Sequence, residues 1–387
     1  LAVYDADGDE PTSPVFFIQE PEVSGSMAGL PDGTGLIPAG GSAYITWLFI
    51  PAVYAGGEDP RGAEYYIGGT LIAKANGEDV TYPLYPKRVT VKPQPKLDID
   101  YFLPRDVMSD DPFTLDQIEE QIPFDLGVRI KNTGYGPAKN MKLVSGQPKI
   151  VENEKGLLIA FRLLHAFVHG DPVPNPSLTM DFGNIDSFGA KVGRWEMVST
   201  LMGEFIEFDA SFTHAPELGG EMTSLIVDLD ANWLTHTMLI NEPGFDDVYD
   251  FLADTTKEDD ELLPETIFSS EGQDYPVNTV ESNIPGTPNN ANPTVNLTMT
   301  SPPSGWVYTR LEDPSQGLLD LVSVRRSDGK NILVPENAWI TKKIIRKVDQ
   351  PARTEYTLHL VDLNSTGQYA LTFETPPPDD TPPETRP

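Results

Sequence analysis

The chain of 387 residues contains no cysteine, which excludes disulfides, thiolate metal sites and a cysteine nucleophile and leaves the redox compartment open. Positive charge is scarce, because 27 Lys and Arg residues face 59 Asp and Glu residues, for a formal net charge of -32. A field of that sign repels phosphate backbones and anionic lipid surfaces. We therefore expect no nucleic acid and no anionic membrane surface among the partners.

Long apolar runs are missing too. No run approaches the roughly 20 residues of a transmembrane helix, so we expect no membrane span. The sequence starts at Leu1, without a methionine or a charged-then-apolar signal segment, and we interpret it as a processed form or an excerpt. The acidic charge suits a protein kept soluble in salty or calcium-containing surroundings, and we expect an extracellular or cell-surface location.

Proline and glycine are abundant, with 37 and 32 residues. This content is typical of short strands joined by many turns, and it would interrupt long helices. Apolar and polar residues alternate in several segments, and such period-two spacing predicts strands, because successive side chains point to opposite faces of a sheet. The clearest segments are Phe124 to Ile130, Val295 to Met299, Tyr356 to Leu360 and Tyr369 to Phe373. The sequence therefore predicts an all-β fold.

Two tryptophans occur in the same local frame. The motif Gly35-x-Ile37 lies twelve residues before Trp47, and Gly183-x-Ile185 lies twelve residues before Trp195. We interpret this as a partial tandem repeat in which both indoles occupy equivalent buried positions, since aromatic side chains supply a large share of core burial. The alternative is that the two rings are sugar-stacking platforms on the surface.

Two motifs resemble those of known β-sandwich domains. The stretch Val128-x-Ile130-x-Asn132-Thr133-Gly134-x-Gly136-x-Ala138-x-Asn140-x-Lys142-Leu143 resembles the opening strands of bacterial cell-adhesion-related (CARDB-like) domains. The resemblance implies immunoglobulin-like β-sandwiches that act as spacers, adhesins or assembly units, with no catalytic residues to transfer. Asp362 followed by Gly367-x-Tyr369 resembles the tyrosine corner of immunoglobulin-like domains, in which the Tyr hydroxyl bonds back to the backbone.

These features predict tandem immunoglobulin-like β-sandwich modules joined by Pro-rich and acidic linkers. The alternating prolines of Lys92-Pro93-Gln94-Pro95 mark a semi-rigid boundary. The acidic segment that starts at Glu242 is interpreted mostly as loop, with a short helix around Val248 to Ala253. The predicted organisation is a first module at 1–95, incomplete at its N-terminus, a related module at 96–241, a connector at 242–292, an immunoglobulin-like module at 293–375 and a Pro-rich tail at 376–387.

Acidic clusters suggest two calcium sites, because hard cations prefer several closely spaced carboxylate oxygens. The first cluster follows the Pro-rich boundary, where calcium would stiffen the junction between modules; it comprises Asp98, Asp100, Asp106, Asp110 and Asp111. The second comprises Asp5, Asp7 and Asp9, although its glycine and its twelfth residue, Phe16, do not fit the EF-hand order. In both places a solvated acidic surface is the alternative.

Two sequons are candidate glycosylation sites, which a host that modifies Asn-x-Ser/Thr could use. Asn296 precedes Leu297-Thr298 and lies on the expected solvent face of its strand, and Asn364 precedes Ser365-Thr366.

The function expected from these features is that of a non-catalytic, extracellular structural or adhesive segment of a larger surface protein or filament. Its partners would be other copies of itself or further modules of the same long chain. An incomplete first module leaves unpaired strand edges, which invite a strand from outside the 387 residues. The alternative is a glycan-binding accessory region of a secreted hydrolase whose catalytic domain lies outside this chain, with surface glycans as partners.

Overall fold

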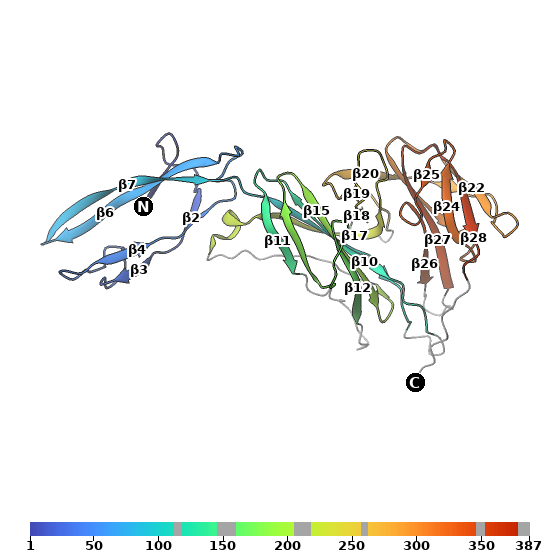
Figure 1. The fold of residues 1–387 in the computed structure, drawn as a ribbon, viewed down its shortest axis with the longest axis horizontal. Coiled ribbons are helices and arrows are strands. Elements are labelled where there is room, and N and C mark those ends of the chain that lie inside the picture. The colour runs from blue at the N-terminus through green and yellow to red at the C-terminus, as the bar shows by residue number, and fades with distance from the viewer. Residues whose placement is uncertain (112–117, 145–159, 205–217, 257–261, 346–352, 378–387) are drawn as a thin grey trace.

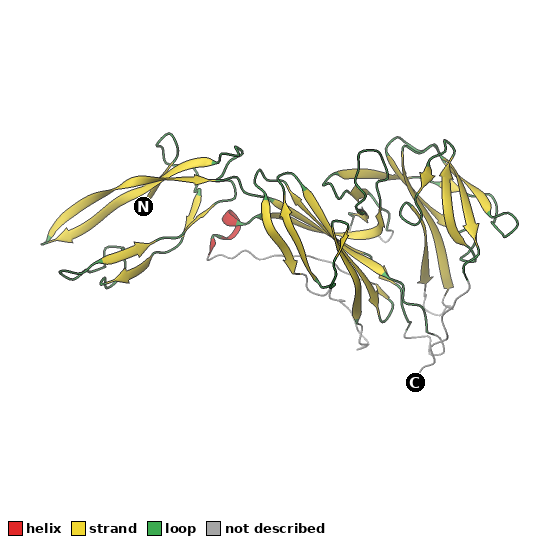
Figure 2. Ribbon diagram, viewed as in Figure 1, coloured by secondary structure: helices red, strands yellow, loops and turns green. Residues whose placement is uncertain are grey.

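The computed structural model describes residues 1–111, 118–144, 160–204, 218–256, 262–345 and 353–377 (Figure 1). Within these ranges the regular structure is β-strand, apart from the 3-10 helix Gly220–Thr223 (Figure 2). The predicted all-β fold is thereby confirmed. Among the described residues no helix has the length and apolar character needed to cross a membrane.

The N-terminal strands form three small sheets at one end of the molecule (Figure 1). The largest has the order β1-β6-β7, and the others are the pairs β2-β5 and β3-β4. The strands are β1 Ala2–Tyr4, β2 Phe16–Ile18, β3 Glu22–Gly25, β4 Ala43–Thr46, β5 Phe49–Pro51, β6 Ala63–Ala75 and β7 Glu78–Val91. One small core joins the β1-β6-β7 sheet to the β2-β5 pair, and it consists of Phe16, Ala52, Ala55, Tyr65 and Val91 with partly buried neighbours.

A twelve-stranded sheet forms the middle of the molecule and continues into its C-terminal part. Its order is β13-β12-β15-β10-β8-β17-β18-β19-β20-β23-β27-β26, and the pairs β8-β17 and β20-β23 are parallel. Its strands are β8 Leu97–Leu103, β10 Phe124–Asn132, β12 Phe161–Val168, β13 Asp171–Pro172, β15 Ala190–Ser199, β17 Ile226–Met238, β18 Asp250–Asp254, β19 Thr266–Phe268, β20 Asp274–Thr279, β23 Trp306–Glu312, β26 Ala338–Ile345 and β27 Arg353–Leu363. A separate short pair joins β9 Asp106–Val107 to β16 Gly203–Glu204.

The core of the middle part lies between this sheet and the pair β11 Ala138–Val144 and β14 Thr179–Ile185. Trp195, on β15, has no exposed surface, and its Nε1 donates a hydrogen bond to the Ser177 carbonyl at 3.0 Å. Gly193, also on β15, allows β14 to approach closely, because a Cβ there would lie 2.4 Å from Met180 Sδ. The ring is therefore a core residue and not a sugar-stacking platform.

Trp47 occupies a different environment. It lies outside the strands, between β4 and β5, and is only half-buried. The prediction that Trp47 and Trp195 hold equivalent buried positions is therefore wrong. Trp195 lies within a ten-residue strand, whereas Trp47 lies in the connection between two short strands. A shared spacing of twelve residues does not determine where strands begin and end, so it does not place two residues in equivalent positions.

Two facing sheets enclose the C-terminal core. The strands β23, β27 and β26 of the large sheet pack against a five-stranded sheet of order β21-β22-β28-β24-β25. That sheet consists of β21 Ser282–Asn283, β22 Thr294–Met299, β24 Asp320–Arg326, β25 Asn331–Ile332 and β28 Gln368–Glu374. The four alternating segments predicted from the sequence lie on strands β10, β22, β27 and β28. Apolar residues of the last three strands, such as Leu297, Leu358 and Leu371, are buried in the C-terminal core.

The acidic segment 242–292 differs from its prediction. It contains strands β18 to β21, and the expected helix around Val248 to Ala253 is instead β18, which pairs with β17 and β19. All five residues of β18 are buried. A strand covered on both faces shows a continuous apolar run, here Phe251 to Ala253, and period-two alternation is then lost.

The tyrosine at the start of β28 bonds to side chains. The Tyr369 hydroxyl donates to Asp362 Oδ2 at 2.7 Å and lies 2.5 Å from Ser365 Oγ. The predicted bond to backbone is therefore wrong. Asp362 is buried and also accepts hydrogen bonds from Arg326 at 2.8 Å and from Lys330 at 2.9 Å. Two cations and a hydroxyl thus compensate one buried carboxylate, which fixes the β23-β27 sheet against the β24-β28 sheet.

Candidate functional site

Exposed apolar side chains are concentrated at the N-terminal end. Of the 21 large hydrophobic residues exposed in the described part of the chain, 13 lie within the first 85 residues. The same stretch, extended to Val91, supplies only 5 of the 48 buried hydrophobic residues. The exposed ones are Leu1, Ile18, Leu30, Leu36, Ile37, Tyr44, Leu48, Tyr54, Leu71, Ile72, Tyr82, Leu84 and Tyr85. Clusters of this kind on a protein surface mark sites of interaction.

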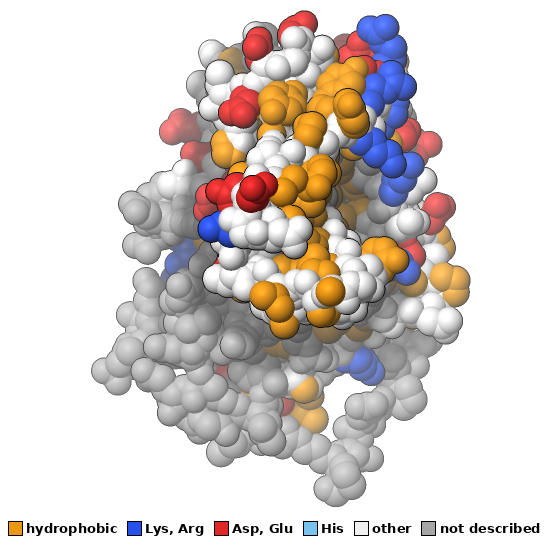
Figure 3. All heavy atoms as spheres, turned by 90° about the vertical axis from the view of Figure 1, so that its left-hand side faces the viewer, with side chains coloured by type: hydrophobic (Ala, Val, Ile, Leu, Met, Phe, Trp, Pro, Cys, Tyr) orange, Lys and Arg blue, Asp and Glu red, His pale blue; other side chains and the backbone are white. Residues whose placement is uncertain are grey.

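Most of these residues belong to two hairpins, which we call the N-terminal arms: the ribbon β6-β7, Ala63–Val91, and the hairpin β3-β4 with its loop, Glu22–Thr46. Both project beyond the small core that contains Phe16 and Tyr65 (Figure 1). In the end-on view the apolar side chains form a band along the arms, with cationic side chains beside it (Figure 3). The arms thus present apolar surface that the described part of the chain leaves uncovered.

The ribbon has one clearly apolar face. Leu71 lies opposite Tyr82 and Ala73 opposite Val80 in the β6-β7 register, and directly opposed residues of an antiparallel pair share a face. Leu84, two residues from Tyr82, lies on the same face. Leu71, Tyr82 and Leu84 are 46%, 53% and 46% exposed. A two-stranded ribbon by itself is marginally stable in water, so a covering partner would stabilise it.

The two edges of the ribbon differ. Strand β1 pairs with β6 only at Tyr66 to Gly68, so in the described structure the outer edge of β6 has no strand beside it from Thr70 to Ala75. The outer edge of β7 carries Pro83 and Pro86, which have no N–H to donate. Proline on an edge strand discourages the addition of another strand. The edge of β6 is the one open to pairing.

The ribbon is electrically neutral. It carries three cations and three acids, which are Lys74, Lys87, Arg88, Glu64, Glu78 and Asp79. Arg88 lies 3.3 Å from Glu64, and Lys74 lies 3.9 Å from Asp79. The whole charge of -32 therefore belongs to the rest of the chain.

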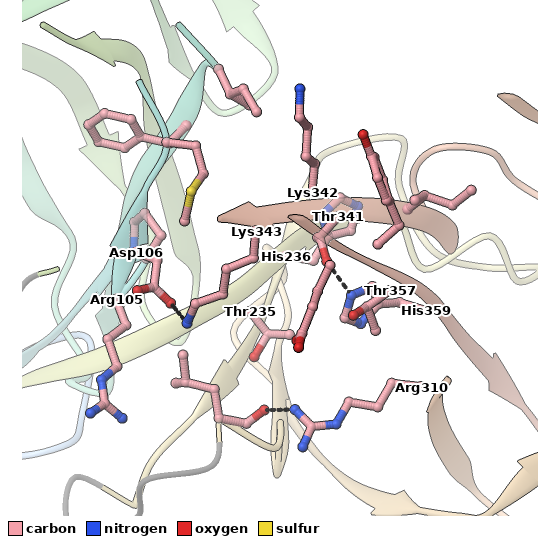
Figure 4. Close-up of a pocket in the computed structure, with 18 of the residues that line it drawn as sticks. Arg105, Asp106, Thr235, His236, Arg310, Thr341, Lys342, Lys343, Thr357 and His359 are labelled. Atoms are coloured by element: carbon pink, nitrogen blue, oxygen red, sulfur yellow. Dashed lines mark hydrogen bonds and ion pairs between the residues drawn. The ribbon is translucent and has the colours of Figure 1, made fainter. Parts of the chain in front are cut away.

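A second candidate surface is a groove of about 1500 Å³ lined by residues of β10, β15 and β17 and by residues of β23, β26 and β27 (Figure 4). Lys343 Nζ lies 2.5 Å from Asp106 Oδ2 and links β26 to β9. Arg194 lies 2.9 Å from Asp125, and Arg353 pairs with Glu355. These three cationic side chains of the groove form ion pairs with acidic side chains. A ligand in the groove would therefore meet hydrogen-bonding groups and little net charge.

Two histidines of the groove sandwich a tryptophan. His236, on β17, stacks on Trp339, on β26, at 3.9 Å between ring centroids, and Trp339 stacks on His359, on β27, at 4.8 Å. His359 Nδ1 lies 2.7 Å from the Tyr308 hydroxyl, and Nε2 lies 2.8 Å from Thr341 Oγ1. Both ring nitrogens of His359 are engaged within the protein, which makes the stack a structural feature.

Burial lowers the pKa of both histidines, because the charged imidazolium loses solvation. The pKa of His359 falls to about 3, with help from nearby His236 and Arg310, and that of His236 falls to about 4. Both rings are therefore neutral at pH 7. This arrangement was not predictable from the sequence, since His236 and His359 are 123 positions apart and each is isolated in its own segment.

The predicted junction cluster does not form one carboxylate group. Asp100 Oδ2 accepts two hydrogen bonds from Arg129, at 2.8 and 3.0 Å, and Asp106 binds Lys343. Asp98 lies opposite Lys131 in the β8-β10 register. Asp110 Oδ1 accepts the Glu119 N–H at 3.3 Å, and Asp111 is buried. Within the described residues no three His, Asp or Glu side chains come together as a metal-ligand set.

The second acidic segment forms a turn. One oxygen of Asp5, Oδ1, accepts the backbone N–H groups of Asp7 and Asp9, each at 3.0 Å. The arrangement satisfies the backbone of the turn with a single carboxylate. Calcium binding by either acidic cluster stays a prediction.

Both sequon asparagines are exposed. Asn296 lies on the solvent face of β22, as expected from its alternation. Asn364 lies in a turn with a φ of 51°, and its Oδ1 accepts the Gly305 N–H at 2.9 Å. Glycosylation of Asn296 and Asn364 stays a prediction.

Comparison with protein-family models, with curated proteins and with solved structures gives no match.

Proposed function

We propose that the chain is a non-catalytic structural or adhesive segment of a larger extracellular surface protein or filament, and that it acts by presenting its N-terminal arms to another protein chain. We further propose that the middle and C-terminal parts are immunoglobulin-like modules that position these arms. The observation that carries the proposal is the concentration of 13 of 21 exposed large hydrophobic residues in the first 85 residues. Surface of this kind is costly in water unless a partner covers it.

The shape of the N-terminal end supports binding over a simple spacer role. A spacer needs stable modules with polar surfaces, whereas here two hairpins extend from a core of only five buried hydrophobic residues. The partner we favour is another copy of the same chain. A segment that repeats along a filament has its own copies as the most abundant neighbours, and symmetric self-contacts are the commonest way in which proteins assemble.

Sedimentation velocity tests this proposal. The wild-type protein should associate as its concentration rises, and the double variant Leu71→Ser/Tyr82→Ser should stay monomeric, because it removes two apolar side chains from the face of the ribbon. Leu318→Ser is the matched control, since Leu318 is 76% exposed but belongs to the C-terminal part. A wild-type protein that stays monomeric and binds no other chain of its assembly would contradict the proposal.

The groove favours a second candidate function, glycan binding. Hydroxyl and charged side chains line it, including Thr341, Lys342 and Thr357, and such groups recognise sugars through hydrogen bonds. Calorimetry with a panel of oligosaccharides would test this alternative. Binding that is lost in Lys342→Ala, at an unchanged melting temperature, would support it, and the absence of heat with the wild-type protein would remove it.

A further inference from the structure

We propose that two copies of this chain join through the outer edges of their β6 strands, residues 70–75, in an antiparallel pair that makes one sheet of order β7-β6-β6-β7. The inference rests on the proposed function, and it specifies which part of the N-terminal arms makes the contact and which partner it takes. Its basis is the difference between the two edges of the ribbon, the charge of the ribbon and the apolar face that the ribbon leaves open.

The hydrogen bonds of β6 show where a strand can be added. On one side β6 pairs with β7 from Ala63 to Ala75, with one register shift between Ile67 and Gly69. On the other side β1 covers only Tyr66 to Gly68. Beyond Gly69, alternate N–H and C=O groups of β6 point away from β7, and no strand among the described residues receives them. An unpaired row of this kind is a template for another extended chain.

The composition of the two edges selects β6 over β7. The open segment reads Thr70-Leu71-Ile72-Ala73-Lys74-Ala75, which contains no proline and includes β-branched residues that favour strands. Strand β7 contains Pro83 and Pro86, and each proline removes one potential donor from the ladder. A strand added to β7 would therefore form fewer hydrogen bonds than a strand added to β6.

The neutral ribbon is a part of the chain that a second copy can approach without net repulsion. Two molecules of net charge -32 repel each other over most of their surfaces, because like charges approach on every side. The ribbon carries equal numbers of cations and acids, so two ribbons meet without net repulsion. An isologous antiparallel contact also closes on itself about a two-fold axis, which gives a defined dimer.

Pairing also brings the two apolar faces side by side, where neighbouring side chains contact each other across the new strand pair. Each ribbon contributes Leu71, Tyr82 and Leu84 on one face, and edge-to-edge pairing places the two faces beside each other in a four-stranded sheet. Sheets of three or more strands with an apolar face reach a stability that a lone ribbon lacks. The symmetric dimer therefore stabilises the part of the molecule with the smallest core.

Single cysteines test the contact cleanly, because the chain has no cysteine of its own. We would place one cysteine per variant at Thr70, Ile72, Ala73 and Lys74 along the β6 edge. The matched controls are Thr81→Cys on β7 and Leu318→Cys in the C-terminal part, both at exposed positions. Disulfide dimers are then measured under mild oxidation, alongside the sedimentation of each reduced variant.

We expect at least one β6 variant to form disulfide dimers about tenfold or more faster than Leu318→Cys, since paired edges hold the two thiols at high effective concentration. The rate should peak at the position nearest the two-fold axis. Two results would overturn β6 pairing in a protein that still associates: fastest cross-linking at Thr81→Cys, or equal rates at all positions. Either result would leave the arms as the binding surface. A wild-type protein that never associates would overturn the self-assembly proposal as well.

Discussion

Among the described residues with almost no exposed surface, Trp195 has the largest side chain. It contacts the core between β10, β14 and β15, and its one polar atom donates to the Ser177 carbonyl. Burial of this kind makes a single residue responsible for a large part of the stability of its module, because the ring removes extensive apolar surface from water and leaves a cavity when it is deleted.

Trp195→Ala should lower the free energy of unfolding of the middle part by about 3 to 5 kcal/mol, through lost burial and the cavity that remains. Denaturant unfolding followed by circular dichroism measures the loss. Trp47→Ala is the control, because Trp47 is half-buried and outside the strands, and it should cost clearly less. Equal losses in the two variants would contradict the assignment of Trp195 to the core.

The histidine stack should make the C-terminal part sensitive to acid. The folded-state pKa values of about 4 for His236 and about 3 for His359 lie below the ordinary value of 6.5, so the unfolded chain binds more protons in this range. Their contribution to stability is complete above pH 6.5 and is lost as pH falls toward 3. Burial raises the pKa of Asp250 to about 7, which acts in the opposite direction over part of this window.

His236→Phe isolates the histidine effect, because phenylalanine keeps a ring beside Trp339 and cannot take up a proton. The variant should lose less stability than the wild-type protein between pH 6.5 and 4, as measured by melting temperature at each pH. His165→Phe is the control, since His165 is exposed. Parallel pH profiles for His236→Phe and the wild-type protein would refute a role for His236 in acid sensitivity.

At the scale of elements, alternation of apolar and polar residues identified four strands. Strands β22 and β28 alternate buried and more exposed residues, whereas the middle of β10 and of β27 is buried on both faces. Strands β10, β22, β27 and β28 contain the predicted alternating residues. Strand β18 escaped prediction, because both of its faces are buried and its apolar residues run without interruption from Phe251 to Ala253. The pairing of segments was also out of reach, because contacts such as β20 with β23 and β8 with β17 depend on side chains distant in sequence.

The approach of β15 to β14 depends on a glycine. A side chain at Gly193 would place its Cβ 2.4 Å from Met180 Sδ and 2.9 Å from Phe182 Cζ. Gly193→Ala should therefore destabilise the protein by roughly 1 to 3 kcal/mol, the usual cost of overpacking a core. Gly203→Ala is the matched control, since none of the described residues lies within 4 Å of its Cβ position and it should be close to neutral. Equal melting temperatures for the two variants would show that the core accommodates the added methyl group.

At the scale of the whole molecule, burial is unevenly distributed. The middle and C-terminal parts hold 43 of the 48 buried hydrophobic residues, while the N-terminal arms expose most of theirs. The sequence indicated unpaired strand edges in the first module, but it could not say which edge, because that depends on how far β1 extends along β6. It placed the candidate metal residues in one cluster, whereas the strands direct Asp100 to Arg129 and Asp106 to Lys343.

The central claim is that the β6 edge binds a second copy of the chain. Amide hydrogen exchange, measured on the wild-type protein at low and at high concentration, tests it most directly, since new hydrogen bonds slow exchange only where a strand is added. We expect slower exchange at high concentration for residues 70–75, with the Pro-containing edge of β7 unchanged. Exchange of residues 70–75 that stays fast and independent of concentration, in a protein that sedimentation shows to be associated, would contradict it.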